Sequence, residues 1–71
     1  MPRLPVVSGR EAIKALSKLE FAAVRQKGSH VVMTGKDRTF AIPLHPELDR
    51  GTLRAILREA NVSIEAFVDA L

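Results

Sequence analysis

The stretch that decides the fold is FAAVRQKGSHVVMTGKDRTFAIP, residues 21–43. It holds three short runs of residues that favour a pleated surface, at 21–26, 30–34 and 39–42. Two turn-like segments lie between the runs, Lys27-Gly28-Ser29 and Gly35-Lys36-Asp37-Arg38, and each is short enough to close a hairpin. The stretch therefore predicts a three-stranded antiparallel meander that ends at Pro43, which has no amide hydrogen to donate.

Helical patterns flank this meander on both sides. Before it, Ser8 and Glu11 have the spacing of a capping box, and apolar residues recur at helical spacing to about residue 19. After it, Asp49 is an expected N-cap for a helix that runs to about Ala60, with Asn61 suited to its left-handed end. The apolar stripe of this second helix comprises Leu53, Ile56, Leu57 and Ala60.

A last short helix is expected after Ser63, with Phe67 and Leu71 folded back on the core. The whole order is α-β-β-β-α with an extra C-terminal turn or two of helix, which is an α+β fold in one domain, residues 1–71. Both main helices are expected on one face of the sheet, because a small meander needs one face covered. The opposite face is then left partly open for a partner.

Composition narrows the class of protein further. The chain has no cysteine, so it has neither a disulfide nor a thiol nucleophile, and an intracellular, cytoplasmic location is expected. No apolar run approaches the ~20 residues of a membrane span, and the start, Met1 to Val7, lacks a stretch of signal-peptide length. Two histidines and scattered carboxylates have no metal-ligand spacing, so neither a metal nor a cofactor is expected.

Charge is distributed unevenly along the chain. Residues 1–38 carry eight Lys and Arg against three acids, a balance of +5, whereas residues 39–71 carry three against five, a balance of −2. A basic half indicates a polyanionic partner such as nucleic acid. The plainer interpretation is a solvated surface with surplus lysine, and charge alone does not choose between the two.

His30 closes the run Arg25-Gln26-Lys27-Gly28-Ser29-His30 between the first two predicted strands. Alternation along the second of these strands places His30, Val32 and Thr34 on one face and Val31 and Met33 on the other. Two cations, a glycine, a hydroxyl and an imidazole in one turn can grip a phosphate and move a proton. Imidazole is the side chain whose ordinary pKa lies closest to neutrality, so it can accept and donate a proton at working pH. The functional hypothesis is phosphodiester cleavage with His30 as acid or base; the structural alternative is a surface histidine in a hairpin.

The segment after the third predicted strand, Ile42-Pro43-Leu44-His45, contains the only other histidine. Cleavage by transesterification needs one group to take a proton and another to protonate the leaving oxygen. His45 could fill that second role, or Lys27 could stabilise charge instead, while Lys36 and Arg38 are secondary candidates for phosphate contacts. The alternative for His45 is a loop residue that forms hydrogen bonds beside Pro46.

Taken together, these motifs resemble the HicA family of toxin ribonucleases over about residues 8–67. The resemblance rests on the order of five parts along the chain: a helix, the motif RQKGSH, a short hairpin, the motif IPLH and finally the segment DRGTLRAILREANVS. It implies a fold similar to double-stranded-RNA-binding domains and a metal-independent, ribosome-independent endoribonuclease that cleaves mRNA. It also implies that His30 of the Gly-Ser-His motif is catalytic, and that a HicB-type antitoxin covers the His30 region.

The chain departs from the pattern of the family in two segments, and two other classes of function stay open. Many relatives have Gly-Phe where this chain has Glu20-Phe21, and Lys-Pro-Gly-Thr is frequent where it has Asp49-Arg50-Gly51-Thr52.

One alternative function is a non-catalytic module that binds double-stranded RNA, although its usual lysine-rich helix start is missing here. The other is a pure protein-interaction domain whose open sheet face or strand edge pairs with another chain.

Overall fold

The computed structural model describes residues 3–71, so Met1 and Pro2 of the predicted domain and start segment lie outside the described residues. The element order is α1 (Gly9–Lys18), β1 (Ala22–Lys27), β2 (His30–Gly35), β3 (Arg38–Pro43), α2 (Arg50–Ala60) and α3 (Ile64–Ala70). The three strands form one antiparallel sheet in the order β1-β2-β3. The predicted α+β meander with flanking helices is confirmed.

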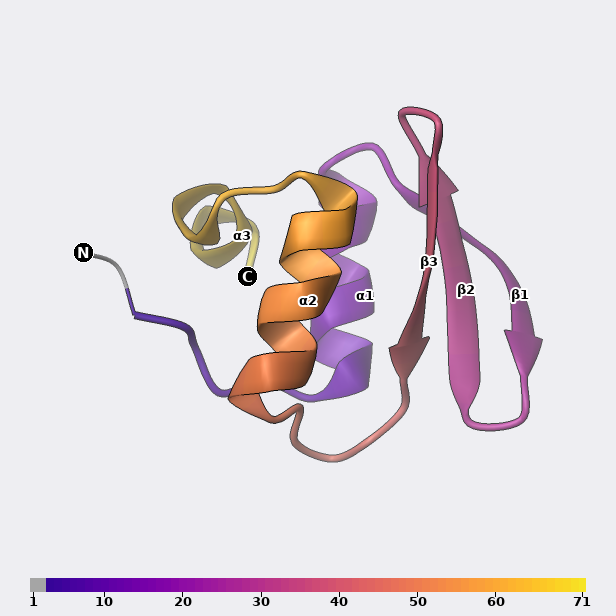
Figure 1. Cartoon of the computed structure of the whole chain (residues 1–71), viewed down its shortest axis with the longest axis horizontal. Coiled ribbons are helices and arrows are strands. Elements are labelled where there is room, and N and C mark those ends of the chain that lie inside the picture. Colours follow the sequence, from indigo (N-terminus) through magenta and orange to yellow (C-terminus); the bar gives the residue numbers. More distant parts are fainter. Residues whose placement is uncertain (1–2) are drawn as a thin grey trace.

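The helices α1 and α2 lie on the same face of the sheet (Figure 1). The short helix α3 packs against α1 on the side of α1 that faces away from the sheet. The core between these layers includes all three phenylalanines, Phe21, Phe40 and Phe67, each at most 4% exposed. The rings of Phe21 and Phe40 meet edge to face, with centroids 5.3 Å apart. Within residues 3–71, no helix lies on the other face of the sheet, which is called the outer face below. The expectation of one covered and one open face is confirmed.

The helix caps follow the sequence signals with one exception. Ser8 and Glu11 form the complete capping box of α1, and the Ser63 hydroxyl accepts the Ala66 N–H at the start of α3. Asn61 ends α2 in the left-handed conformation, as expected. Asp49 is the N-cap of α2, but its side chain makes no capping hydrogen bond. The first turn of α2 therefore lacks the side-chain stabilisation that its sequence predicts.

At the C-terminus, one of two expected core contacts is present. Phe67 is fully buried and anchors α3. Leu71, which was expected to fold back on the core, stays 48% exposed, so that part of the prediction is wrong. The helix α3 turns Phe67 and Ala70 toward the core and ends at Ala70, so Leu71 lies beyond its buried side as the C-cap.

Glu20 lies at one of the places where the chain departs from the pattern of the HicA-like sequences that it resembles. It joins α1 to β1 with φ at 74°, in the left-handed region that glycine adopts without strain. We therefore expect Glu20→Gly to raise the free energy of unfolding by about 0.5–1 kcal/mol, as measured by urea denaturation. Glu20→Ala is the matched control, because it removes the side chain but keeps the strained backbone, and it should bring no gain. Equal effects of the two substitutions would show that the backbone at residue 20 carries no strain.

Candidate functional site

His30 is the first residue of β2 and its side chain is exposed. Along this strand Val31 and Met33 are buried, whereas Val32 and Thr34 are half-buried. Because side chains alternate along a strand, His30, Val32 and Thr34 lie on the outer face, away from the helices. The alternation predicted from the sequence is confirmed at each of these positions.

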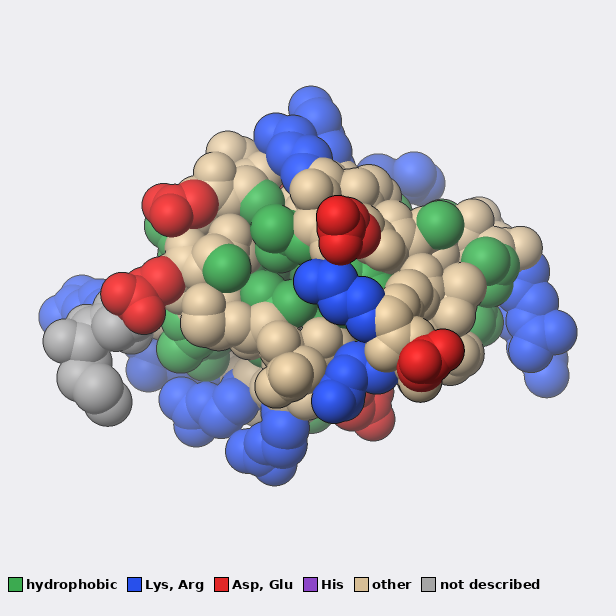
Figure 2. All heavy atoms as spheres, turned by 90° about the horizontal axis from the view of Figure 1, so that it is seen from above, with side chains coloured by type: hydrophobic (Ala, Val, Ile, Leu, Met, Phe, Trp, Pro, Cys, Tyr) green, Lys and Arg blue, Asp and Glu red, His purple; other side chains and the backbone are tan. Residues whose placement is uncertain are grey.

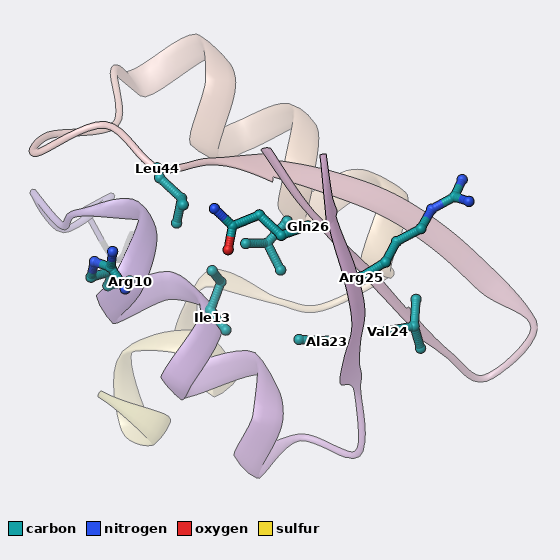
Figure 3. A pocket seen from close by; sticks show the side chains of 8 residues that line it. Arg10, Ile13, Ala23, Val24, Arg25, Gln26 and Leu44 are labelled. Atoms are coloured by element: carbon teal, nitrogen blue, oxygen red, sulfur yellow. The ribbon is translucent and has the colours of Figure 1, made fainter. Parts of the chain in front are cut away.

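The register of the sheet places cationic residues beside His30. Lys27 of β1 lies directly opposite His30, and Arg25 lies opposite Val32. Opposed residues of an antiparallel pair share a face with Cβ atoms about 5 Å apart, so Lys27 and Arg25 also belong to the outer face. A β-bulge between Ala23 and Arg25 sets Val24 next to Arg25, and both point away from α1 (Figure 3). The imidazole and both cations of the predicted site therefore share one surface.

The β1–β2 turn beside His30 is short, and a side-chain hydrogen bond stabilises it. Gly28 has φ at 60° and precedes Ser29 in a two-residue loop, which fits a type II′ hairpin turn. Nothing lies within 4 Å of the position that a Cβ on Gly28 would take, so the turn is open to a ligand. The Gln26 side-chain amide donates a 3.0 Å hydrogen bond to the Gly28 carbonyl oxygen. Arg25, Lys27, Gly28 and Ser29 are thus all exposed around His30, as the sequence predicts.

His45 lies at the same end of the sheet as His30. The backbone N–H of Leu44 donates to the Ser29 carbonyl oxygen at 2.7 Å, which joins the segment after β3 to the β1–β2 turn. The His45 carbonyl oxygen in turn accepts the Gly9 N–H at 3.0 Å, and its side chain is exposed. His45 was predicted as a site residue for its imidazole, and no sequence pattern indicated these backbone hydrogen bonds.

Lys36 and Arg38 lie at the opposite end of the sheet. Arg38 opposes Gly35, the last residue of β2, whereas His30 is the first, a separation of roughly 15–17 Å along the strand. Lys36 Nζ lies 5.5 Å from the Phe21 ring centroid, and one Arg38 guanidinium nitrogen donates to the Glu59 carbonyl oxygen at 2.8 Å. Figure 2 looks onto the end with the β2–β3 turn and shows no histidine. These two secondary candidates are therefore not part of the His30 site.

The arrangement has a defined chemical capacity. An exposed imidazole can move a proton, and a lysine opposite it can hold a phosphate oxygen or neutralise developing charge. Among residues 3–71, no three His, Cys, Asp or Glu side chains lie close enough together to hold a metal ion. Within the same residues, no helix is both long and apolar enough to cross a membrane.

Comparison with known proteins gives one informative result. A comparison with curated proteins finds no match for this sequence. Residues 9–62 match the family model of the HicA toxin of bacterial toxin–antitoxin systems, which spans most of the 71-residue chain. The match runs from the first residue of α1 to just past α2, and so includes the sheet, His30 and His45. The chain belongs to the HicA toxin family and is the toxin of a toxin–antitoxin system.

Proposed function

We propose that this toxin is a ribosome-independent endoribonuclease that cleaves mRNA without a metal ion, with His30 as the catalytic acid or base. The observation that carries the proposal is the placement of His30 on the open outer face, directly opposite Lys27. Family membership supports a toxin, and the site supplies a chemistry by which a toxin could act. Because mRNA is the proposed substrate, the proposed place of action is the cytoplasm.

In this mechanism the RNA backbone lies along the outer face at the β1–β2 turn. Arg25 and Lys27 hold phosphate oxygens, the Ser29 hydroxyl donates a hydrogen bond, and Gly28 lets the backbone come close. The His30 imidazole takes the proton from the attacking oxygen or delivers one to the leaving oxygen. The complementary step belongs to His45, which lies at the same end of the sheet, or is replaced by charge stabilisation from Lys27.

The proposed enzyme should have low sequence preference. Single-stranded RNA is usually read by stacking its bases on aromatic side chains. The chain has neither Trp nor Tyr, and its three phenylalanines are all buried. Contacts to phosphate do not depend on the base, so affinity should come from the basic positions and fall steeply with salt.

Lys27→Ala tests the phosphate contacts. We expect this substitution to weaken RNA binding about equally for different RNA sequences and to reduce the slope of log affinity against log salt by about 1. The measurement is fluorescence anisotropy over a salt series, with His30→Ala in the background so that the RNA stays intact. Lys18→Ala is the matched control, because Lys18 is exposed at the end of α1 and outside the site. Equal salt slopes for the two variants would exclude Lys27 from the RNA contact.

The proposed protein partner is a HicB-type antitoxin that buries the neighbourhood of His30. Toxin family membership implies an antitoxin, and the cations around His30 favour acidic groups on its surface. A complex in which His30 stays fully open to solvent would contradict this part of the proposal.

A further inference from the structure

β1 is an exposed edge of the sheet. The strand order places it outermost, and all six of its residues are exposed. Among residues 3–71, no backbone hydrogen bond joins residues 22–27 to a segment outside the sheet. An edge strand of this kind presents unpaired N–H and C=O groups that another extended chain can pair with.

A groove runs beside this edge, between β1 and α1, with a volume of about 350 Å³. It exists because α1 covers the helix side of β1 only in part, which leaves Ala23 and Gln26 exposed. In Figure 3, Ile13 of α1 and Gln26 of β1 reach into it from its two sides. Its lining is largely apolar, and Arg10 of α1 contributes a positive charge. The volume lies at the low end of ligand-binding clefts, about 300–1,000 Å³, and suits side chains.

One extended chain can occupy the edge and the groove together. A strand added to β1 would lie about 4.8 Å from it and send alternate side chains to the two faces of the sheet. Those on the helix side would enter the groove beside Ile13 and Ala23. Those on the outer face would come next to Arg25 and Lys27, which share that face with His30.

Charge selects the kind of chain that fits. The edge and the groove carry Arg10, Arg25 and Lys27, and neither the strand nor the groove lining contains an acidic residue. A second copy of β1 would bring its own Arg25 and Lys27 against the same cations, and like charges placed side by side are destabilising. An acidic partner strand is favoured instead, because it meets the same charges with the opposite sign.

We infer that the free edge of β1 is the docking site for an extended acidic segment of a protein partner. The segment adds a fourth strand to the sheet, inserts aliphatic side chains into the groove and directs carboxylates to Arg10 and to the outer-face cations. The inference rests on the antitoxin that family membership implies, and it does not require RNA cleavage. It assigns to the partner a surface that shares Arg25 and Lys27 with the proposed nuclease site and extends beyond that site into the groove beside α1.

The test uses the peptide ELEVEEE as probe and the ¹⁵N-labelled full chain as target. When the peptide is extended, its odd-numbered glutamates face the outer-face cations, and its even-numbered side chains bring one Leu, one Val and one carboxylate to the groove with Arg10. We expect the peptide to shift the amide resonances of residues 22–27 and of the groove lining, and to slow amide exchange in β1. A strand donates hydrogen bonds to one neighbour only from alternate residues. N-methylation of one alternate set of peptide amides should therefore weaken binding about tenfold, whereas N-methylation of the other set should have little effect.

Arg10→Glu and Lys14→Glu provide a matched pair of variants. Both reverse one exposed positive charge on α1, but only Arg10 lines the groove. Arg10→Glu should weaken peptide binding about tenfold and Lys14→Glu much less. Neither should change RNA cleavage, so failure of this inference is distinguishable from failure of the proposed nuclease. Ala23→Glu, which sets an acid inside the groove, gives an independent test if Arg10→Glu does not fold.

Four results of the peptide experiments would overturn the inference. They are no binding of the peptide at millimolar concentration, shifts confined to the outer face, equal effects of the two N-methylated peptides, and equal effects of Arg10→Glu and Lys14→Glu. Protection of the β1 edge by a single-stranded RNA, but not by the peptide, would also overturn it and assign the groove to a nucleotide.

Discussion

Replacement of His30 by alanine is expected to abolish toxicity while leaving the fold intact. The imidazole is exposed at the start of β2, so its removal opens no cavity in the core. Surface substitutions of this kind change the free energy of unfolding by about 0.5 kcal/mol or less. The loss of a catalytic acid or base, in contrast, removes activity by orders of magnitude. The measurements are growth after induction of each variant and the thermal midpoint of the purified chain.

His45→Ala is the matched control for this substitution, because it makes the same chemical change at the same end of the sheet. It should retain part of the toxicity, since Lys27 can stabilise charge in its place. Two results would contradict the account. One is growth arrest by His30→Ala as strong as that of the wild type. The other is a thermal midpoint so lowered that His30 must be a structural residue.

Gly9→Ala should have the largest effect on stability. A Cβ at residue 9 would lie 2.1 Å from the Pro43 carbonyl oxygen, which is a backbone atom and cannot rotate away. The start of α1 and the end of β3 would have to separate, at an expected cost of about 3 kcal/mol. That is a large part of the stability of so small a domain. Urea denaturation of the wild type and the variant measures the difference.

Gly51→Ala is the control for this prediction. Its Cβ would meet only the Asp49 carboxylate at 3.7 Å, an ordinary contact, and alanine favours the helix more than glycine does. It should be neutral or slightly stabilising. If Gly9→Ala proved as stable as the wild type, the close approach of α1 to β3 would not exist in solution.

The Gly9 contact also matters for the site. The Gly9 N–H donates a hydrogen bond to the His45 carbonyl oxygen, and the Leu44 N–H donates one to the Ser29 carbonyl oxygen. These two bonds link the start of α1, the loop after β3 and the turn before His30. A substitution at Gly9 should therefore lower activity as well as stability, although Gly9 is not part of the proposed RNA contact.

Much of the fold could be predicted because its signals are local. Alternation along 30–34 gave the two faces of β2, and the positions of Ser8 and Ser63 gave the starts of two helices. The placement of His30 on the outer face followed from the same alternation. Lys27 was grouped with His30 because both lie in one short segment, but the sequence analysis placed Lys27 in the turn. The structure makes Lys27 the last residue of β1, directly opposite His30.

Other features depend on tertiary contacts that no local pattern reveals. Lys36 and Asp37 both adopt positive φ in the β2–β3 turn, although neither is glycine. The close approach at Gly9, the bulge in β1 and the groove beside α1 all arise where distant segments meet. Lys36 and Arg38 were grouped with the site for their charge, whereas the length of β2 places them at its far end.

Incubation of the purified wild-type chain with an end-labelled single-stranded RNA, in the presence of a metal chelator, tests the central claim most directly. We expect cleavage by the wild type and a rate about 10²–10⁴ times lower for His30→Ala at the same protein concentration. Intact RNA with the wild type, or equal cleavage by the two proteins, would contradict it.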